Sequence, residues 1–286
     1  MLPLKDNIPT LRFPILTVAL IVLNVIVFGI EFTWSQDRGS ASGRAGQLGA
    51  SEYDVELIEL GAIPYRITHP GKECALGVVG SRQADIVCEG TSEYRQAESQ
   101  TPGGVVDLDE PPWWVTVFTS MFLHGGILHL AGNMLFLWVF GNNIEDSVGR
   151  VIFVPFYLLA GIVAVYAQAF LDTSATIPTV GASGAVAGVL GAYALLHPQA
   201  RVLTLVFIIF FVTLVEIPAM IMLGIWFALQ FLPAVGQLAT PDVTGESGGV
   251  AYFAHVGGFI VGLALIKLLA RRREEAPGEG PPYPVY

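Results

Sequence analysis

The chain has 286 residues, of which 53% are hydrophobic and 13% charged, with a net charge of −10 and a mean hydropathy of +0.62. Soluble domains carry roughly 25% charged residues, so this composition excludes a disordered chain and argues against a fully soluble one. Much of the negative charge lies in residues 31–112, which carry 14 acidic and 6 basic side chains. No nucleic-acid partner is expected, because phosphate binding requires clustered lysine and arginine.

Six apolar stretches approach the roughly 20 helical residues that cross a bilayer. The first, 13–33, lacks the small-residue cleavage pattern of a signal peptide, so we expect it to be retained. Several of the others are short, which glycine-rich helices shielded by their neighbours tolerate. The sequence therefore predicts an all-α membrane protein whose six transmembrane helices cover 13–33, 128–143, 151–171, 183–197, 217–232 and 252–270.

The remaining segments complete the expected organisation. Residues 1–12 form the N-terminus, and residues 34–112 form a large insert between the first and second spans. The remaining five helices lie within 113–270, and the proline-rich tail 271–286 is expected to be disordered. Residues 202–215 are apolar but too few for a separate span before Pro218, so we expect an interfacial or re-entrant segment there.

The positive charges indicate the orientation, because lysine and arginine collect in cytoplasmic loops. Placing both termini in the cytoplasm puts on that side Lys5, Arg12, Arg150, Arg201, Lys267 and Arg271–Arg273. The insert then lies outside the cytoplasm, where its two cysteines, Cys74 and Cys88, can form a disulfide. Two free thiols are the alternative. The low lysine content and abundant small residues favour a bacterial cytoplasmic membrane.

Polar side chains within membrane spans are energetically costly and therefore indicate function. Three of the six spans begin with such groups. Gly181-Ala182-Ser183-Gly184 begins the fourth, His255 begins the sixth, and His124, His129 and Asn133 lie at the start of the second. In the orientation above, these three spans all start at the outer face. The polar groups therefore share one depth, which favours a single site.

Ser183 and His255 are suited to nucleophilic catalysis, because a serine hydroxyl needs a neighbouring base to accept its proton. Ser183 also lies in the first turn of a helix, where unpaired amides can bind an oxyanion. His129 and Asn133 share one helix face and can point donors at the same place. Taken singly, such a serine or histidine more often serves as a cap or packing residue, and only their combination indicates a catalytic site.

Other chemistries lack their motifs in this sequence. There is no His-Glu-x-x-His run for a metalloprotease, no Gly-x-Ser-x-Gly elbow, and no motif for a metal or organic cofactor. Gly258 and Gly262 form a Gly-x-x-x-Gly pair, which on its own indicates close helix packing. Together with Gly184, these glycines are expected to let the fourth and sixth spans approach closely enough to join Ser183 to His255.

Three motifs resemble those of the rhomboid intramembrane serine proteases. They are Gly181-Ala182-Ser183-Gly184, His124-x4-His129-x3-Asn133 and Ala254-His255-x2-Gly258-x3-Gly262. The resemblance covers residues 13–33 and 113–270 and implies a six-helix rhomboid bundle without a cofactor. It also implies that Ser183 is the nucleophile, His255 its base in a dyad, and His129, Asn133 and the Ser183 amide the oxyanion hole. Glu145 matches a family glutamate that braces the outer loop. His124 lies on a different helix face from His129, so we expect it to shape the site and not to act in it.

The chain departs from the family pattern at two places, since Val115-Thr116 replace a Trp-Arg pair and Ala187 replaces a tyrosine that stacks on the catalytic histidine. The implied activity is cleavage of transmembrane protein substrates that enter from the lipid bilayer near the fifth span and unwind near the outer face. One alternative is an inactive rhomboid-like factor that binds membrane proteins and directs their trafficking. Another is a transporter or channel, which would need polar residues across the full bilayer depth.

Overall fold

The computed structural model describes residues 1–36, 44–79, 84–100, 104–208, 211–239 and 250–270, so the predicted disordered tail 271–286 lies outside the described residues. The chain forms two compact units. The helix unit comprises Met1–Leu23, Gly126–Ala164 and the described part of Ala182–Tyr286. The insert unit comprises Asn24–Gly125 and Val165–Gly181.

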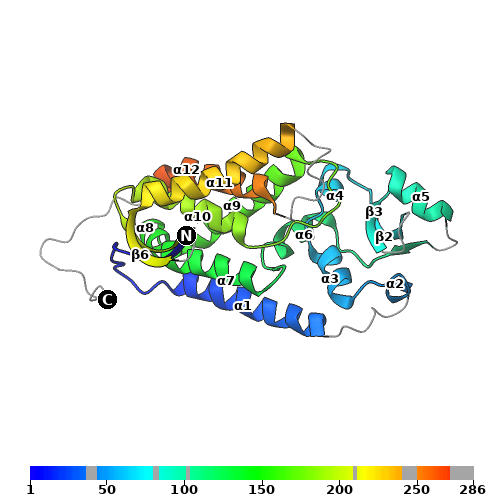
Figure 1. Cartoon of the computed structure of the whole chain (residues 1–286), viewed down its shortest axis with the longest axis horizontal. Helices are drawn as coiled ribbons and strands as arrows, with labels where there is room; N and C mark the ends of the chain where they lie inside the picture. Colours follow the sequence, from blue (N-terminus) through cyan, green and yellow to red (C-terminus); the bar gives the residue numbers. More distant parts are fainter. Residues whose placement is uncertain (37–43, 80–83, 101–103, 209–210, 240–249, 271–286) are drawn as a thin grey trace, which may run out of the picture. The chain divides into compact units, whose positions relative to one another are not determined.

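The chain is mostly helical and is an integral membrane protein. Within the described residues, five helical segments are long and apolar enough to cross a membrane, namely Ile15–Trp34, Ile127–Val148, Arg150–Leu171, Ala219–Gln237 and Tyr252–Leu269. They correspond to α1 (Ile15–Gln36), α7 (Ile127–Phe136) with the π-helix η1 (Leu137–Gly141) and α8 (Asn142–Val148), α9 (Arg150–Leu171), α11 (Ala219–Ala239) and α12 (Tyr252–Leu269) (Figure 1). The predicted fourth span is α10 (Ser183–Leu196), a shorter apolar helix whose residues from Gly184 to Ala194 are all buried.

Helices α10 and α12 lie in unusually close contact because glycines occupy their contact positions. A methyl group added at Gly258 would overlap the carbonyl oxygen of Gly184, and one added at Gly262 would overlap that of Gly188. Without side chains at these positions, the two backbones approach each other directly. The Gly-x-x-x-Gly pair therefore sets the distance between α10, which begins with Ser183, and α12, whose first turn carries His255.

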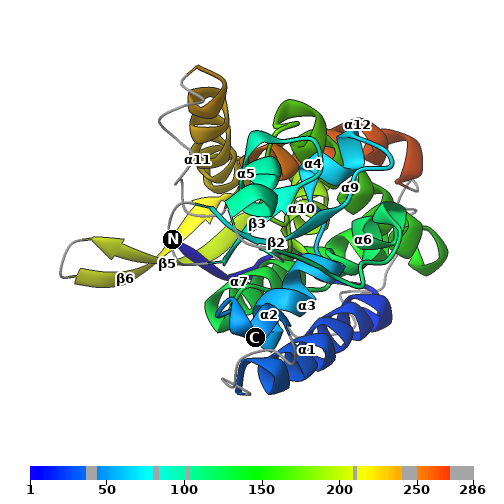
Figure 2. The same ribbon diagram turned by 90° about the vertical axis from the view of Figure 1, so that its right-hand side faces the viewer.

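The helix unit also contains a three-stranded antiparallel sheet, so the all-α prediction is wrong here. Its order is β1-β5-β6, formed by β1 (Leu2–Asp6), β5 (Arg201–Ile208) and β6 (Phe211–Pro218). The described residues of the segment 202–215, which we expected to be interfacial or re-entrant within a helical chain, belong to β5 and β6. Its β-branched and aromatic residues favour strands. Figure 2 shows the β5–β6 hairpin extending away from α10 and α12.

The insert unit contains the second departure from the all-α prediction. Its sheet has the order β3-β2-β4, with β2 (Cys74–Val78), β3 (Ala84–Cys88) and β4 (Val105–Asp107). Cys74 and Cys88 are opposite each other in the β2–β3 pair, and a disulfide joins them. The short helices of this unit are α2 (Arg44–Gln47), α3 (Glu52–Leu60), α4 (Pro64–Thr68), α5 (Ser92–Gln100) and α6 (Trp113–Thr119).

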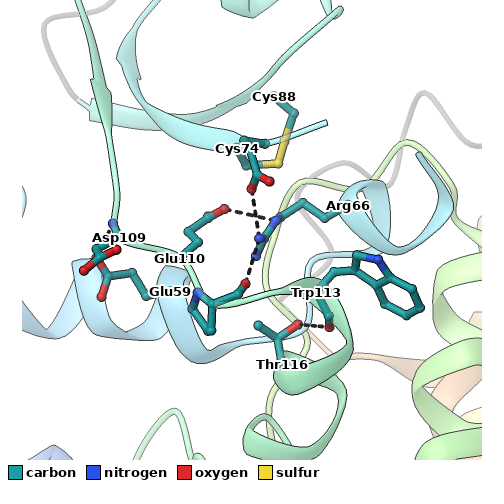
Figure 3. A network of polar contacts seen from close by, with 10 residues as sticks. Glu59, Arg66, Cys74, Cys88, Asp109, Glu110, Trp113 and Thr116 are labelled. Carbon is teal, nitrogen blue, oxygen red and sulfur yellow. Dashed lines mark hydrogen bonds and ion pairs between the residues drawn. A yellow bond between two sulfur atoms is a disulfide. The ribbon is translucent and has the colours of Figure 1, made fainter. Parts of the chain in front are cut away.

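A buried cluster of polar side chains centred on Arg66 links α4 to the segment before α6 (Figure 3). The Arg66 side chain is 3% exposed and lies 3.0 Å from a carboxylate oxygen of Glu110 and 2.9 Å from one of Glu73. Its Nη2 also donates a hydrogen bond to the carbonyl oxygen of Pro111. Burial and the neighbouring Glu73 raise the pKa of Glu110 to about 8, although Arg66 acts in the opposite direction.

This raised pKa predicts that the insert loses stability as the pH rises. Between the ordinary value of 4.5 and about 8, folded Glu110 holds a proton that the unfolded chain has released. The free energy of unfolding therefore falls with pH, by at most ~1.4 kcal/mol per pH unit for one proton. Urea unfolding of the full chain, followed by tryptophan fluorescence from pH 5 to 9, measures this slope.

The matched variants for that measurement are Glu110→Gln and Glu98→Gln. Glu110→Gln removes the titrating group and should flatten the slope, whereas Glu98 lies exposed on α5 and its replacement should leave the slope unchanged. A wild-type stability that rises over this pH range would contradict the assignment.

Candidate active site

Ser183 is the first residue of α10, and the backbone before it turns sharply. Gly181 has a φ of 123°, a conformation that glycine adopts readily and other residues rarely. Ala182 follows with near-helical backbone angles and accepts the first helical hydrogen bond, from the amide of Val186. The amides of the first turn, including that of Ser183, therefore have no partners within the helix and can bind a negatively charged oxygen.

The structure brings Ser183 and His255 together. The Oγ of Ser183 lies 2.7 Å from Nε2 of His255, although the two residues are 72 positions apart in the sequence. Both side chains are half-buried. Each residue lies in the first turn of its helix, and the contact between Gly184 and Gly258 holds these two turns close. The pair thus has the geometry needed for proton transfer from a serine hydroxyl to an imidazole.

A third helix contributes Gln230, which the sequence interpretation missed. The Oε1 of Gln230 on α11 lies 2.8 Å from Nδ1 of His255, the ring nitrogen that faces away from Ser183. Trp226, one turn earlier on α11, places its ring centroid 6.0 Å from that of the imidazole. A polar glutamine within an apolar span was the available signal, because such a residue is costly unless it is paired.

Asn133 and His129 lie on α7, which packs against α10. The Asn133 side chain is buried, and its Nδ2 has no hydrogen-bond partner among the residues that the structure describes. A buried amide donor without a partner is costly, and an incoming oxyanion would satisfy it. The placement of Asn133 and His129 as donors beside the dyad stays a prediction.

Glu145 is held against the start of α1. Its carboxylate accepts hydrogen bonds from the backbone amide and the hydroxyl of Thr17, at 2.7 and 2.8 Å, and from the amide of Leu16. It therefore braces the first turn of α1, and its expected role at the outer loop stays a prediction. The physical reason is that the first amides of a helix lack helical partners and attract a carboxylate.

His124, Gly181 and the Cys74–Cys88 disulfide belong to the insert unit. The backbone amide of His124 donates to both carboxylate oxygens of Glu31, at 3.0 and 3.2 Å, and the His124 side chain is fully buried. Glu31 is a second polar residue that the sequence interpretation missed. In the parts of the chain that the structure describes, no group of three histidine, cysteine, aspartate or glutamate side chains is placed to hold a metal ion.

More than half of this chain is similar in sequence to known proteins. The family model described as Rhomboid domain matches residues 111–272. The chain is 31% identical over 153 residues to Rhomboid protein 1, mitochondrial, of Saccharomyces cerevisiae, covering 52% of this chain and 40% of that protein. It is 33% identical over 153 residues to Rhomboid protease GluP of Bacillus subtilis, covering 54% and 26%.

A third relative is Presenilin-associated rhomboid-like protein A, mitochondrial, of Danio rerio, to which the chain is 28% identical over 164 residues, covering 54% of this chain and 38% of that protein. The chain thus spans less than half the length of each of these three relatives.

Proposed function

Because the chain belongs to the rhomboid family, we propose that it is an intramembrane serine endopeptidase that cleaves transmembrane segments of other membrane proteins. The observation that carries the proposal is the 2.7 Å distance between Ser183 Oγ and His255 Nε2. The alternative, an inactive rhomboid-like binding factor, is less well supported because both residues of the dyad are present.

In the proposed reaction, His255 Nε2 takes the hydroxyl proton of Ser183 while Oγ attacks the carbonyl carbon of the scissile peptide bond. The resulting oxyanion accepts hydrogen bonds from Asn133 Nδ2, His129 and the Ser183 amide. His255 then gives its proton to the leaving nitrogen, which releases one product with a new N-terminus. His255 then takes a proton from a water molecule whose oxygen attacks the carbonyl carbon of the Ser183 ester. As the ester C–O bond breaks, His255 gives that proton to Ser183 Oγ, and the second product leaves with a new carboxylate.

The substrate must expose a carbonyl that its own helix would hide. We therefore expect cleavage where glycine, alanine or proline weakens the substrate helix. The proposal includes substrate entry near α11 and six membrane spans, of which α10 is the fourth. It also places both termini in the cytoplasm and residues 34–112 on the opposite side of the membrane. Relatives include mitochondrial proteins, so they do not support the prediction of a bacterial cytoplasmic membrane.

The proposal is tested by placing the purified chain in liposomes with a model transmembrane substrate and analysing the products by mass spectrometry. Wild type should cut within or beside the transmembrane segment, and Ser183→Ala should not, while unfolding at the same temperature. An inactive factor would bind the substrate without cutting it, and a channel would make the liposomes leak. Equal cleavage by Ser183→Ala would overturn the proposal.

A further inference from the structure

We infer that Gln230 is a positioning residue that holds His255 in the tautomer and orientation needed to accept the proton of Ser183. This inference rests on the proposed protease function. Gln230 and the dyad come from three helices, with Ser183 on α10, Gln230 on α11 and His255 on α12. Both ring nitrogens of His255 are engaged, Nδ1 with Gln230 and Nε2 with Ser183.

The chemistry of the amide oxygen fixes the tautomer. Oε1 of Gln230 can only accept a hydrogen bond, so the 2.8 Å contact requires a proton on Nδ1 of His255. A neutral imidazole carries a single ring proton, which leaves Nε2 as an acceptor. Nε2 is the atom that lies 2.7 Å from the Ser183 hydroxyl. The contact with Gln230 thus selects the form of His255 that can act as a base.

Gln230 also restrains the rotation of the ring. Position 187, one turn after Ser183, carries the small side chain of Ala187 and not an aromatic ring that could stack on the imidazole. Trp226 offers only a tilted ring contact, with an angle of 40° between the two planes. Hydrogen bonds at both nitrogens leave the imidazole little freedom to turn about its Cβ–Cγ bond.

The bond further links the dyad to the position of α11. This helix packs on α12 through Phe227, whose ring centroid lies 4.7 Å from that of Phe259, while Leu229 and Leu232 are 62% and 67% exposed. Any displacement of α11 beyond hydrogen-bond reach would release Nδ1 and free the ring. A substrate that entered by displacing α11 would therefore be cut only after the helix had returned.

The first test measures kcat and KM for the transmembrane substrate from pH 5 to 9. Gln230→Leu cannot accept the Nδ1 proton and should lower kcat by about 10- to 100-fold while KM changes by less than about threefold. Gln230→Glu keeps an acceptor and should restore most of kcat. In the pH profile of this variant, the fall of kcat on the acidic side should move to higher pH. The reason is that a carboxylate stabilises the protonated imidazole, which cannot act as a base.

The control variant is Leu229→Ala, at the exposed position next to Gln230 on α11. It should retain the kcat, KM and pH profile of wild type, which excludes a general effect of a substitution in this turn of the helix. A Gln230→Leu variant with wild-type kcat and pH profile would overturn the inference.

A second readout separates this inference from the protease proposal, because it needs no activity. Nitrogen-15 NMR of histidine-labelled full-length protein reports which ring nitrogen carries the proton, and comparison with His255→Ala assigns the signals of His255. Wild type should show a protonated Nδ1 and a bare Nε2, and Gln230→Leu should lose this preference. A wild-type His255 with its proton on Nε2 would refute the role of Gln230, whether or not the chain cleaves substrates.

Discussion

Replacing Gly262 with alanine is expected to destabilise the helix unit and to remove most of the proteolytic activity. The added methyl group would overlap the carbonyl oxygen of Gly188 and lie within 3 Å of its carbonyl and α carbons. These are backbone atoms, which cannot rotate away as a side chain could, so α10 and α12 must separate. Overpacking of this kind costs about 1–3 kcal/mol, and sometimes more.

Activity should fall further than stability, because the same two helices carry Ser183 and His255. A displacement of about 1 Å between reacting groups can cost about 100-fold in rate. Thermal unfolding in detergent measures the first effect, and kcat in liposomes measures the second.

The matched control is Gly224→Ala on α11. A methyl group there meets nothing within 4 Å, and alanine is favoured over glycine in a helix by about 1 kcal/mol. Gly224→Ala should therefore unfold at an equal or higher temperature than wild type and remain active. If Gly262→Ala behaved in the same way, the close contact between α10 and α12 would not be needed.

The second large effect concerns the dyad itself. Ser183→Ala and His255→Ala should each lower kcat by about 10⁴- to 10⁶-fold, since the hydroxyl is the nucleophile and the imidazole its base. Because the two side chains act as one unit, the double variant should be no slower than the slower single variant. Single-turnover assays at saturating substrate measure all three.

If the fold-decreases in kcat of the two single variants multiplied in the double variant, Ser183 and His255 would not act as one unit. His255→Ala with more than a tenth of the wild-type rate would likewise exclude His255 as the base. All three variants should unfold within a few degrees of wild type, so that a loss of rate is not a loss of fold.

Hydropathy could predict where the helices lie, because membrane spans need long apolar runs and few segments of the chain have them. The polar residues Ser183, His255 and Asn133 could be selected for the same reason. The strands β5 and β6 could not be recognised by hydropathy, since a short apolar run is compatible with a strand, a buried helix or an interfacial segment. The β-branched residues within 202–215 were the signal that pointed to strands.

The partners of individual polar groups were beyond the reach of sequence spacing. Gln230 meets His255 only because α11 packs on α12, and Glu145 meets Thr17 across 128 positions of sequence. The cysteine pairing was easier to foresee, because the insert contains only Cys74 and Cys88. The strands that bring these cysteines opposite each other were not predicted, since the 34–112 segment was interpreted from its composition alone.

Covalent labelling of the full-length protein in liposomes with a fluorophosphonate, followed by peptide mass spectrometry, tests directly whether Ser183 and His255 form a catalytic dyad. One adduct is expected, on Ser183, and its formation should be lost or strongly slowed in His255→Ala. An adduct on another residue, no adduct on wild type, or equal labelling of Ser183 with and without His255 would contradict the dyad.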